Sequence, residues 1–379
     1  MIPAPRILDE FRTAGFGLVT GVPCSYLTPL IDTVIADPDT DYVGATNEGD
    51  ALALAAGSEL AGRRSVVMFQ NSGLGNAINP LTSLTWSFRI PALILTTWRG
   101  QPGGAPDEPQ HEVMGEITGG LLDLARVPWE PFPTEEAELA AALGRARAHM
   151  DLNKTPYGLI MEKGTVEPGA GRTESPLRPL PPPGGEAAPD PWPALEADAV
   201  LREAFEATEA DAVITTTGFT GRALYAVGDR ENQLYMVGSM GCASSLALGL
   251  ALTRPDLRVV CLDGDGALLM RMGALATLGY ERPKNLVHVL LDNGVHDSTG
   301  AQATVSRSVD PVGVARACGY PRVERLVGAG SLHAALAAPT DELTFLHVRT
   351  EPRADRKLSR PTITPPEVAE RLRGWIAAR

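Results

Sequence analysis

Short apolar runs alternate with longer amphipathic or alanine-rich segments along most of the chain. Short apolar runs bounded by glycine or polar residues are typical of strands buried in a parallel sheet, and the longer segments between them indicate helices. In the first half the predicted strands are 16–20, 42–45, 65–69, 92–96 and 157–161, and the predicted helices are 26–36, 49–60, 78–87 and 135–150. In the second half the predicted strands are 212–215, 234–236, 258–262, 286–291, 322–325 and 344–349, with a final helix over 365–378. This alternation predicts an α/β protein whose parallel sheets carry helices on both faces.

A proline-rich segment separates the two halves. Nine prolines lie between residues 168 and 193. Proline lacks a backbone N–H group and restricts the chain, so this segment cannot sustain a helix or a central strand. We therefore predict two doubly wound parallel-sheet domains, 1–167 and 196–379, joined by a linker over 168–195. An ordered surface loop would make the same connection.

The charge and composition exclude several classes of protein. The formal net charge is −13 and no stripe rich in Lys or Arg occurs, which argues against a nucleic-acid partner. No apolar run approaches the ~18 residues of a membrane span, and the N-terminus lacks the cationic and apolar regions of a signal peptide. A soluble, cytoplasmic protein is expected. An anionic substrate would need a local cationic pocket.

Polar residues follow two successive strands of the second half. Asp265 lies between Gly264 and Gly266 after the strand over 258–262, and Asn293 follows the strand over 286–291. A carboxylate and an amide at adjacent strand ends suit a hard cation, and glycines let backbone amides approach a phosphate closely. The pattern predicts a metal–diphosphate cofactor. A simple turn is the alternative, and a dinucleotide site is disfavoured because the G-x-G-x-x-G pattern would require glycine where Leu269 stands.

Two further strand ends carry candidate residues. Gly238, Ser239 and Met240 follow the strand over 234–236, where small residues allow either close backbone approach to a ligand or close helix–sheet packing. Glu48 follows the strand over 42–45 and precedes an alanine-rich helix. On the residues alone, Glu48 is an acid that complements the helix dipole.

The G-D-G motif, with Asn293 placed 28 residues after Asp265, resembles the thiamine-diphosphate motif. Over nearly its whole length outside the linker, the chain is similar to the short, two-domain thiamine-diphosphate-dependent decarboxylases of the phosphonopyruvate decarboxylase family. The strings that carry this resemblance are GVPCSYLTPLID, QNSGLGNAINPLTSL, RGQPGGAPDEPQHEVMG, VGSMGCASSLALGLAL and LDNGVHDSTGAQ. Sulfopyruvate decarboxylases are near relatives in this family.

The resemblance implies thiamine diphosphate and Mg²⁺ as cofactors. It places Asp265, the Asn293 side chain and the Val295 carbonyl on Mg²⁺. It implies that Met240 holds the cofactor in a bent shape and that Glu48 hydrogen-bonds N1′ of its pyrimidine ring. The remaining residues implied to bind the cofactor are Thr217, Gly218, Gly238, Ser239, Gly264, Gly266 and Ala267.

The resemblance also implies a reaction: non-oxidative decarboxylation of 3-phosphonopyruvate to phosphonoacetaldehyde and CO2, in phosphonate and antibiotic biosynthesis. Sulfopyruvate is the alternative substrate. A carboligase is less consistent with a chain that lacks a middle domain. A non-catalytic cofactor-binding protein would have no need to retain Glu48, Asp265 and Asn293 together.

Candidate substrate and proton-transfer residues lie in loops after strand ends. His111 and His296 are candidates for proton transfer, with capping or structural hydrogen bonding as the alternative. Arg99 could hold a phosphonate bidentately or form a surface salt bridge. Ser25 could donate to the substrate or cap the next helix. Asp107 and Asp297 could orient the histidines at the substrate or cap helices.

In this family the pyrimidine domain of one chain meets the diphosphate domain of another. The resemblance therefore implies a homodimer or a homotetramer with active sites at the subunit interface. The other expected partner is a small anionic 2-keto acid.

Overall fold

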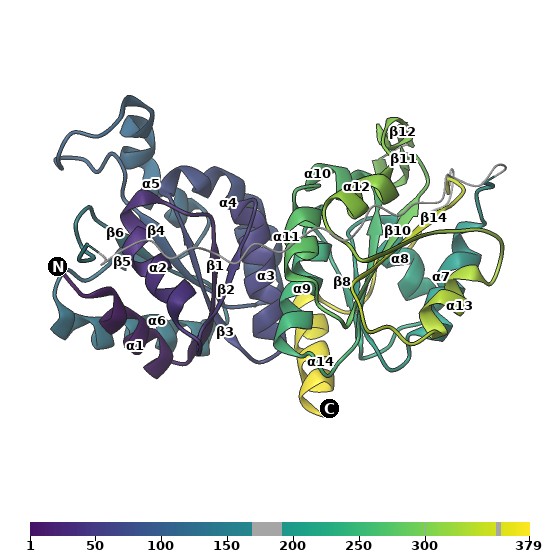
Figure 1. The fold of residues 1–379 in the computed structure, drawn as a ribbon, viewed down its shortest axis with the longest axis horizontal. Coiled ribbons are helices and arrows are strands. Elements are labelled where there is room, and N and C mark those ends of the chain that lie inside the picture. The colour runs from purple at the N-terminus through teal and green to yellow at the C-terminus, as the bar shows by residue number, and fades with distance from the viewer. Residues whose placement is uncertain (169–191, 300, 354–357) are drawn as a thin grey trace. The chain divides into compact units, whose positions relative to one another are not determined.

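A computed structural model describes residues 1–168, 192–299, 301–353 and 358–379. The chain divides into two compact units, Met1–Leu177 and Arg178–Arg379, and each contains a sheet flanked by helices (Figure 1). The division falls inside the predicted linker, most of which lies outside the described residues.

The first unit is built on a six-stranded parallel sheet with the order β2-β1-β3-β4-β6-β5. Its strands are β1 (Phe16–Gly21), β2 (Asp41–Gly44), β3 (Arg64–Phe69), β4 (Leu93–Thr97), β5 (Trp129–Pro131) and β6 (Tyr157–Met161). Its helices are α1 (Ala4–Thr13), α2 (Thr28–Ala36), α3 (Glu48–Leu60), α4 (Leu74–Pro80), α5 (Glu112–Leu124) and α6 (Glu136–Asn153). A π-helical segment, Leu81–Trp86, continues α4.

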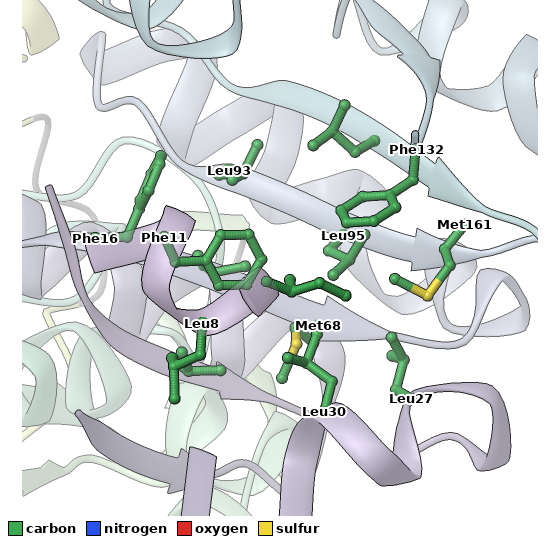
Figure 2. Packing of buried hydrophobic residues seen from close by; sticks show 14 of the residues in the cluster. Leu8, Phe11, Phe16, Leu27, Leu30, Met68, Leu93, Leu95, Phe132 and Met161 are labelled. Atoms are coloured by element: carbon green, nitrogen blue, oxygen red, sulfur yellow. The ribbon is translucent and has the colours of Figure 1, made fainter. Parts of the chain in front are cut away.

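Both faces of this sheet are buried, because successive strand residues point to opposite sides. Met68 of β3 belongs to a cluster shared with α1, α2 and α6, whereas its neighbour Val67 belongs to a second cluster shared with α3, α4 and α5. Figure 2 shows the first cluster, where Phe11 and Leu30 pack toward Leu95 of β4. Helices therefore cover both faces, as the continuous apolar runs of the strands predict.

The second unit has a six-stranded parallel sheet with the order β13-β14-β10-β9-β7-β8, and a short antiparallel pair, β11-β12. Its strands are β7 (Ala212–Thr215), β8 (Gln233–Tyr235), β9 (Val259–Gly264), β10 (Leu286–Asp292), β11 (Val295–His296), β12 (Gln302–Ala303), β13 (Arg322–Leu326) and β14 (Thr344–Arg349). Its helices are α7 (Ala197–Ala207), α8 (Phe219–Val227), α9 (Ala243–Thr253), α10 (Asp265–Met270), α11 (Ala274–Glu281), α12 (Pro311–Ala317), α13 (Ser331–Ala337) and α14 (Pro365–Ala377).

The two large sheets share one topology. When the strands of each are numbered 1 to 6 along the chain, both orders read 2-1-3-4-6-5. Strand 2 lies on one side of strand 1 and strand 3 on the other, so the order in which strands are added reverses between strands 1 and 3. These strands are β1 and β3 in the first unit and β7 and β9 in the second. In open α/β sheets, ligands bind in the crevice at the carboxyl ends of such a pair.

The predicted α/β class and parallel sheets are confirmed, and each predicted strand corresponds to an observed strand within two residues at either end. The prediction omitted α1, α5, β5 and the short strands β11 and β12. Three glycines reduce the helix propensity of α5, and β5 is a three-residue edge strand that ends at Pro131. Among the described residues, no helix combines the length and apolarity needed to cross a membrane.

Candidate active site

The carboxyl ends of β7 and β9 bring together two of the predicted cofactor loops. Gly218 follows β7 with a φ of 98°, a left-handed conformation that favours glycine. Asp265 follows β9 as the first residue of α10. The two loops line one small cavity of about 80 Å³, so they meet where the strand order reverses, as expected for a ligand-binding crevice.

Asp265 is buried beside hydrogen-bond donors. Thr304 donates its hydroxyl proton to the Asp265 carboxylate, and only 4% of the Asp265 surface is exposed. Burial raises the pKa of Asp265, and the nearby negative charge of Asp292 raises it further. A bound cation would stabilise the ionised carboxylate, which the fold alone disfavours.

Asn293 is held in a fixed orientation near Asp265. Its Nδ2 donates to Asp297 Oδ2 at 2.7 Å, and its Oδ1 accepts the backbone N–H of Val295 at 3.0 Å. The hydrogen bond to Asp297 therefore helps to set the orientation of the Asn293 amide. Asp297 Oδ2 also accepts the backbone N–H of Arg353 at 3.1 Å.

Gly266 allows three segments to approach one another. A Cβ atom at Gly266 would lie 2.5 Å from His296 Cε1 and 3.2 Å from Met240 Cε, so any larger residue would displace one of these side chains. Met240 belongs to a tight turn in which Ser239 and Gly241 have φ angles of 51° and 89°. The predicted wedge residue and the predicted proton-transfer histidine thus contact the same glycine.

The cavity brings together most of the residues predicted for this half of the site. The predicted residues that line it are Thr217, Gly218, Met240, Gly264, Asp265, Gly266, Ala267, Asn293, Val295, His296 and Asp297. Gly238 and Ser239 lie in the turn beside Met240 but do not line it. In the described parts of the chain, no group of three or more His, Cys, Asp or Glu side chains could hold a metal ion. The predicted metal set instead combines one carboxylate with amide and carbonyl oxygens.

In the first unit, Glu48 begins α3 and is half-buried. Asn47 caps this helix by accepting the Gly49 N–H at 2.8 Å, and Asn76 Nδ2 donates to Glu48 Oε2 at 2.8 Å. A Cβ atom at Gly73 would lie 2.3 Å from Glu48 Oε1, so any larger residue there would displace the Glu48 side chain. The loop from Gly73 to Asn76 therefore fixes the Glu48 carboxylate.

Arg99 and Asp107 form a closed pair at the end of β4. Arg99 Nε and Nη2 donate to the two carboxylate oxygens of Asp107 at 2.6 and 2.5 Å, and both side chains are at most 14% exposed. The guanidinium holds the pKa of Asp107 well below its ordinary value. Arg99 Nη1 contacts Ser25 Oγ at 3.4 Å. Asp107 thus occupies Nε and Nη2 of the Arg99 guanidinium. Only Nη1 lies near Ser25, another predicted substrate residue.

His111 is 5% exposed, and its Nδ1 has no hydrogen-bond partner among the residues that the structure describes. Its backbone carbonyl packs against Gly100, the residue after Arg99, where a Cβ atom would lie 2.1 Å from the oxygen. The first unit therefore places Ser25, Arg99 and Asp107 in contact, and the His111 backbone lies against the residue that follows Arg99. His111 occupies the N-cap position of α5, but its side chain forms no capping hydrogen bond there.

Comparisons with known proteins agree with this geometry. Residues 4–118 match the thiamine pyrophosphate enzyme N-terminal TPP-binding domain, and residues 219–348 match the C-terminal TPP-binding domain. A thiamine diphosphate-dependent 4-hydroxybenzoylformate decarboxylase from Rhodococcus jostii RHA1 has the same fold, with a TM-score of 0.69 at 16% identity over 92% of this chain and 99% of that one. The chain therefore belongs to the thiamine pyrophosphate enzymes.

Relatives at higher identity define the family more narrowly. The chain is 46% identical to a phosphonopyruvate decarboxylase from Streptomyces viridochromogenes, over 99% of this chain and 95% of the relative. It is 30% identical to a sulfopyruvate decarboxylase from Methanosarcina acetivorans, over 92% of each protein. The chain belongs to the family of the phosphonopyruvate decarboxylases, and the resemblance noted in the sequence is confirmed.

The residues present fit the cofactor that this family implies. The glycine at position 266 and the turns at Gly218 and Gly241 leave backbone accessible at strand ends, as a diphosphate requires. Asp265, Asn293 and Val295 supply oxygen ligands of the kind that Mg²⁺ accepts, together with phosphate oxygens and water. Thr216 Oγ1 and Asp297 Oδ1 are buried and lack a hydrogen-bond partner in the described chain, and both residues line this cavity.

Arg353 also lines the cavity, and the sequence analysis did not select it. Its side chain is 8% exposed; Nε donates to Asp198 Oδ1 at 3.0 Å, while Nη2 is buried without a partner among the described residues. Burial lowers the pKa of Arg353. An incompletely bonded buried cation is costly, so Arg353 is a candidate to bind the diphosphate. No motif marks this residue, which follows β14 in a segment with several arginines.

Replacing Arg353 with Met is expected to weaken thiamine diphosphate binding by roughly tenfold or more, the effect of one lost charge-assisted hydrogen bond. Isothermal titration calorimetry at saturating Mg²⁺ measures this affinity without relying on turnover. Arg353→Lys keeps the charge and should recover part of the affinity. Equal affinity in the Met variant and the unaltered protein would show that Arg353 only balances Asp198 and Asp297.

Proposed function

We propose that the protein catalyses the non-oxidative decarboxylation of 3-phosphonopyruvate to phosphonoacetaldehyde and CO2, with thiamine diphosphate and Mg²⁺ as cofactors. The observation that carries this proposal is the identity of 46% and 45% to two Streptomyces phosphonopyruvate decarboxylases, each over at least 98% of this chain. The relative that acts on sulfopyruvate over a similar length is only 30% identical. A phosphonate substrate therefore has more support than a sulfonate.

The bound cofactor would supply the electron sink that stabilises charge when CO2 leaves. Glu48 would share a proton with N1′ of the pyrimidine ring, because its carboxylate is fixed by Asn76 and packed against Gly73. Asp265, the Asn293 side chain and the Val295 carbonyl would hold Mg²⁺. Asp297 would orient Asn293 through the 2.7 Å hydrogen bond between their side chains.

His296 and His111 would move protons during the reaction. His296 lines the cofactor cavity and contacts Gly266, which places an imidazole at the cofactor loop. His111 is buried with an unbonded Nδ1 among the described residues. An imidazole can donate and accept protons near neutral pH. Both side chains are therefore suited to donate a proton during product formation and to accept a proton in another step of the reaction.

Arg99 would provide positive charge for the terminal phosphonate, with Ser25 as a neighbouring donor. Asp107 already occupies Nε and Nη2, so Asp107 would hold Arg99 in place while Nη1 faces the substrate. Tyr26 reinforces this arrangement, because its ring lies 4.7 Å from the guanidinium and its hydroxyl donates to Asp107 at 3.2 Å.

Replacing Arg99 with Ala should raise KM for 3-phosphonopyruvate by about tenfold or more, and KM for pyruvate much less, because only the first substrate carries a phosphonate for Arg99 to bind. Steady-state kinetics on both substrates measures the difference. Arg145→Ala removes an exposed arginine that pairs with Glu130 and serves as the control. Equal increases of KM for the two substrates would assign Arg99 a structural role.

The remaining parts of the proposal concern assembly and context. The family resemblance implies a homodimer or homotetramer in which the first unit of one chain, with Glu48, meets the second unit of another, with Asp265. The enzyme would act in the cytoplasm, in phosphonate and antibiotic biosynthesis. ³¹P nuclear magnetic resonance of a reaction with 3-phosphonopyruvate tests the chemistry: the phosphonoacetaldehyde signal should replace that of the substrate, and an unchanged spectrum would refute the proposal.

A further inference from the structure

A second, larger cavity of about 820 Å³ lies within the second unit, at the carboxyl ends of β10, β13 and β14. Among the described residues, Asn293 alone lines both this cavity and the one assigned to the cofactor. The two cavities therefore meet at the loop after β10. Carboxyl ends of parallel strands are common ligand sites, and the proposed reaction makes no use of this one.

Arginines dominate the charge of this cavity. Arg307, Arg316, Arg325 and Arg349 line it, against the carboxylates of Asp292 and Asp310. The protein as a whole has a formal net charge of −13. Four guanidinium groups around one cavity repel one another, and this arrangement is unfavourable unless negative charge balances it.

Both carboxylates are already engaged. Asp310 Oδ1 accepts a hydrogen bond from Arg325 Nη2 at 2.6 Å. Asp292 Oδ2 lies 3.0 Å from His347 Nε2, and its Oδ1 accepts from the Gly294 N–H and the Ser306 hydroxyl, each at 3.1 Å. Arg307, Arg316 and Arg349 form no ion pair with any residue in the described ranges, and the bond of Arg349 to Trp192 is to a neutral carbonyl. Four arginines against two carboxylates leave an excess of two positive charges for a ligand.

Trp192 forms a rigid wall of the cavity. Its indole N–H donates to the Leu326 carbonyl at 2.9 Å, and Arg349 Nη1 donates to the Trp192 carbonyl at 2.9 Å. The guanidinium carbons of Arg325 and Arg349 lie 5.9 and 5.7 Å from the ring centroid. Because these contacts fix the wall and two of the arginines, a ligand would meet a largely preformed site.

We propose that this cavity binds a small dianion that carries a phosphate or phosphonate group. Arg307 and Arg316, which have no carboxylate partner among the described residues, match the charge of such a group and can bond its oxygens bidentately. Arg307 Nε lies 3.1 Å from the position that a Cβ atom on Gly294 would take, so this side chain packs on the backbone between Asn293 and Val295. The anion site and the predicted Mg²⁺ ligands therefore share one loop.

Calorimetry on the holoenzyme, saturated with Mg²⁺ and thiamine diphosphate, tests this site with inorganic phosphate and, separately, methylphosphonate. Arg307→Gln combined with Arg316→Gln should weaken binding by roughly tenfold or more through the lost charged hydrogen bonds. Arg147→Gln with Arg202→Gln removes the same charge from exposed positions elsewhere and should leave the affinity unchanged. Both pairs of changes lie on exposed or half-exposed side chains, so the fold should persist.

Binding of both probes to the unaltered protein and its loss in the first double variant would support a site for the phosphate-type group in general. Binding of phosphate alone, lost in the same variant, would support the site and identify free phosphate as its ligand. Binding of methylphosphonate alone, lost in that variant, would support a phosphonate metabolite. No saturable binding of either probe, or equal weakening in both double variants, would overturn the proposal.

Discussion

Replacing Glu48 with Gln is expected to lower kcat by about 100-fold to 10,000-fold, the usual contribution of a proton-transfer group, while thiamine diphosphate affinity changes little. Gln has the same shape, and its carbonyl oxygen can still accept from Asn76, but it cannot gain and lose the proton shared with the pyrimidine ring. The contact with Gly73 also tolerates Gln better than a larger residue. Single-turnover kinetics and calorimetry measure the two effects separately.

Glu112→Gln is the matched control for this variant. Glu112 is the first residue of α5, as Glu48 is of α3, so both acids complement a helix dipole. If Glu48 only stabilises its helix, both variants will lose about 0.3–1 kcal/mol of folding free energy and keep their turnover. A large loss of kcat in Glu48→Gln alone would exclude that alternative.

Replacing Asp265 with Ala should weaken the Mg²⁺-dependent binding of thiamine diphosphate by about 100-fold or more, since even residues that only support a metal ligand are worth 10-fold to 100-fold. Asp265 is the only carboxylate among the three predicted protein ligands. Calorimetry with thiamine diphosphate at several Mg²⁺ concentrations measures the effect. Asp341→Ala removes an exposed carboxylate from the same unit and serves as the control.

The cofactor-free Asp265→Ala variant should unfold at no lower temperature than the unaltered protein. Burial raises the pKa of Asp265, so its ionised form opposes folding at neutral pH when no cation is bound. This expectation separates a binding defect from misfolding. An unchanged affinity for Mg²⁺ and thiamine diphosphate would remove Asp265 from the metal site.

The second half of the site could be predicted because its polar residues follow strands that pair directly. In the parallel register of β9 and β10, Gly264 lies opposite Leu291, so Asp265 and Asn293 emerge at the same edge of the sheet. Strand ends are visible in a sequence as apolar runs followed by polar or glycine residues. Thr217 and Gly218, which the family resemblance implied, follow β7 at the same edge of the sheet.

Other parts of the site depend on contacts that no local pattern contains. Arg353 is separated from Asp297 by 56 positions, and only the folded chain joins its backbone N–H to that carboxylate. Arg99 could be assigned to a strand end, but its bidentate pairing with Asp107 depends on the path of the intervening loop. The arginine-lined cavity combines residues from Trp192 to Thr350, so no local pattern predicts it.

The central claim is tested most directly by comparing kcat/KM for CO2 release from 3-phosphonopyruvate, sulfopyruvate and pyruvate, with and without thiamine diphosphate and Mg²⁺. The proposed function predicts release that requires the cofactors and a strong preference for 3-phosphonopyruvate. A preference for sulfopyruvate would keep the reaction and replace the substrate. The absence of cofactor-dependent CO2 release from any of the three would contradict the assignment as a decarboxylase.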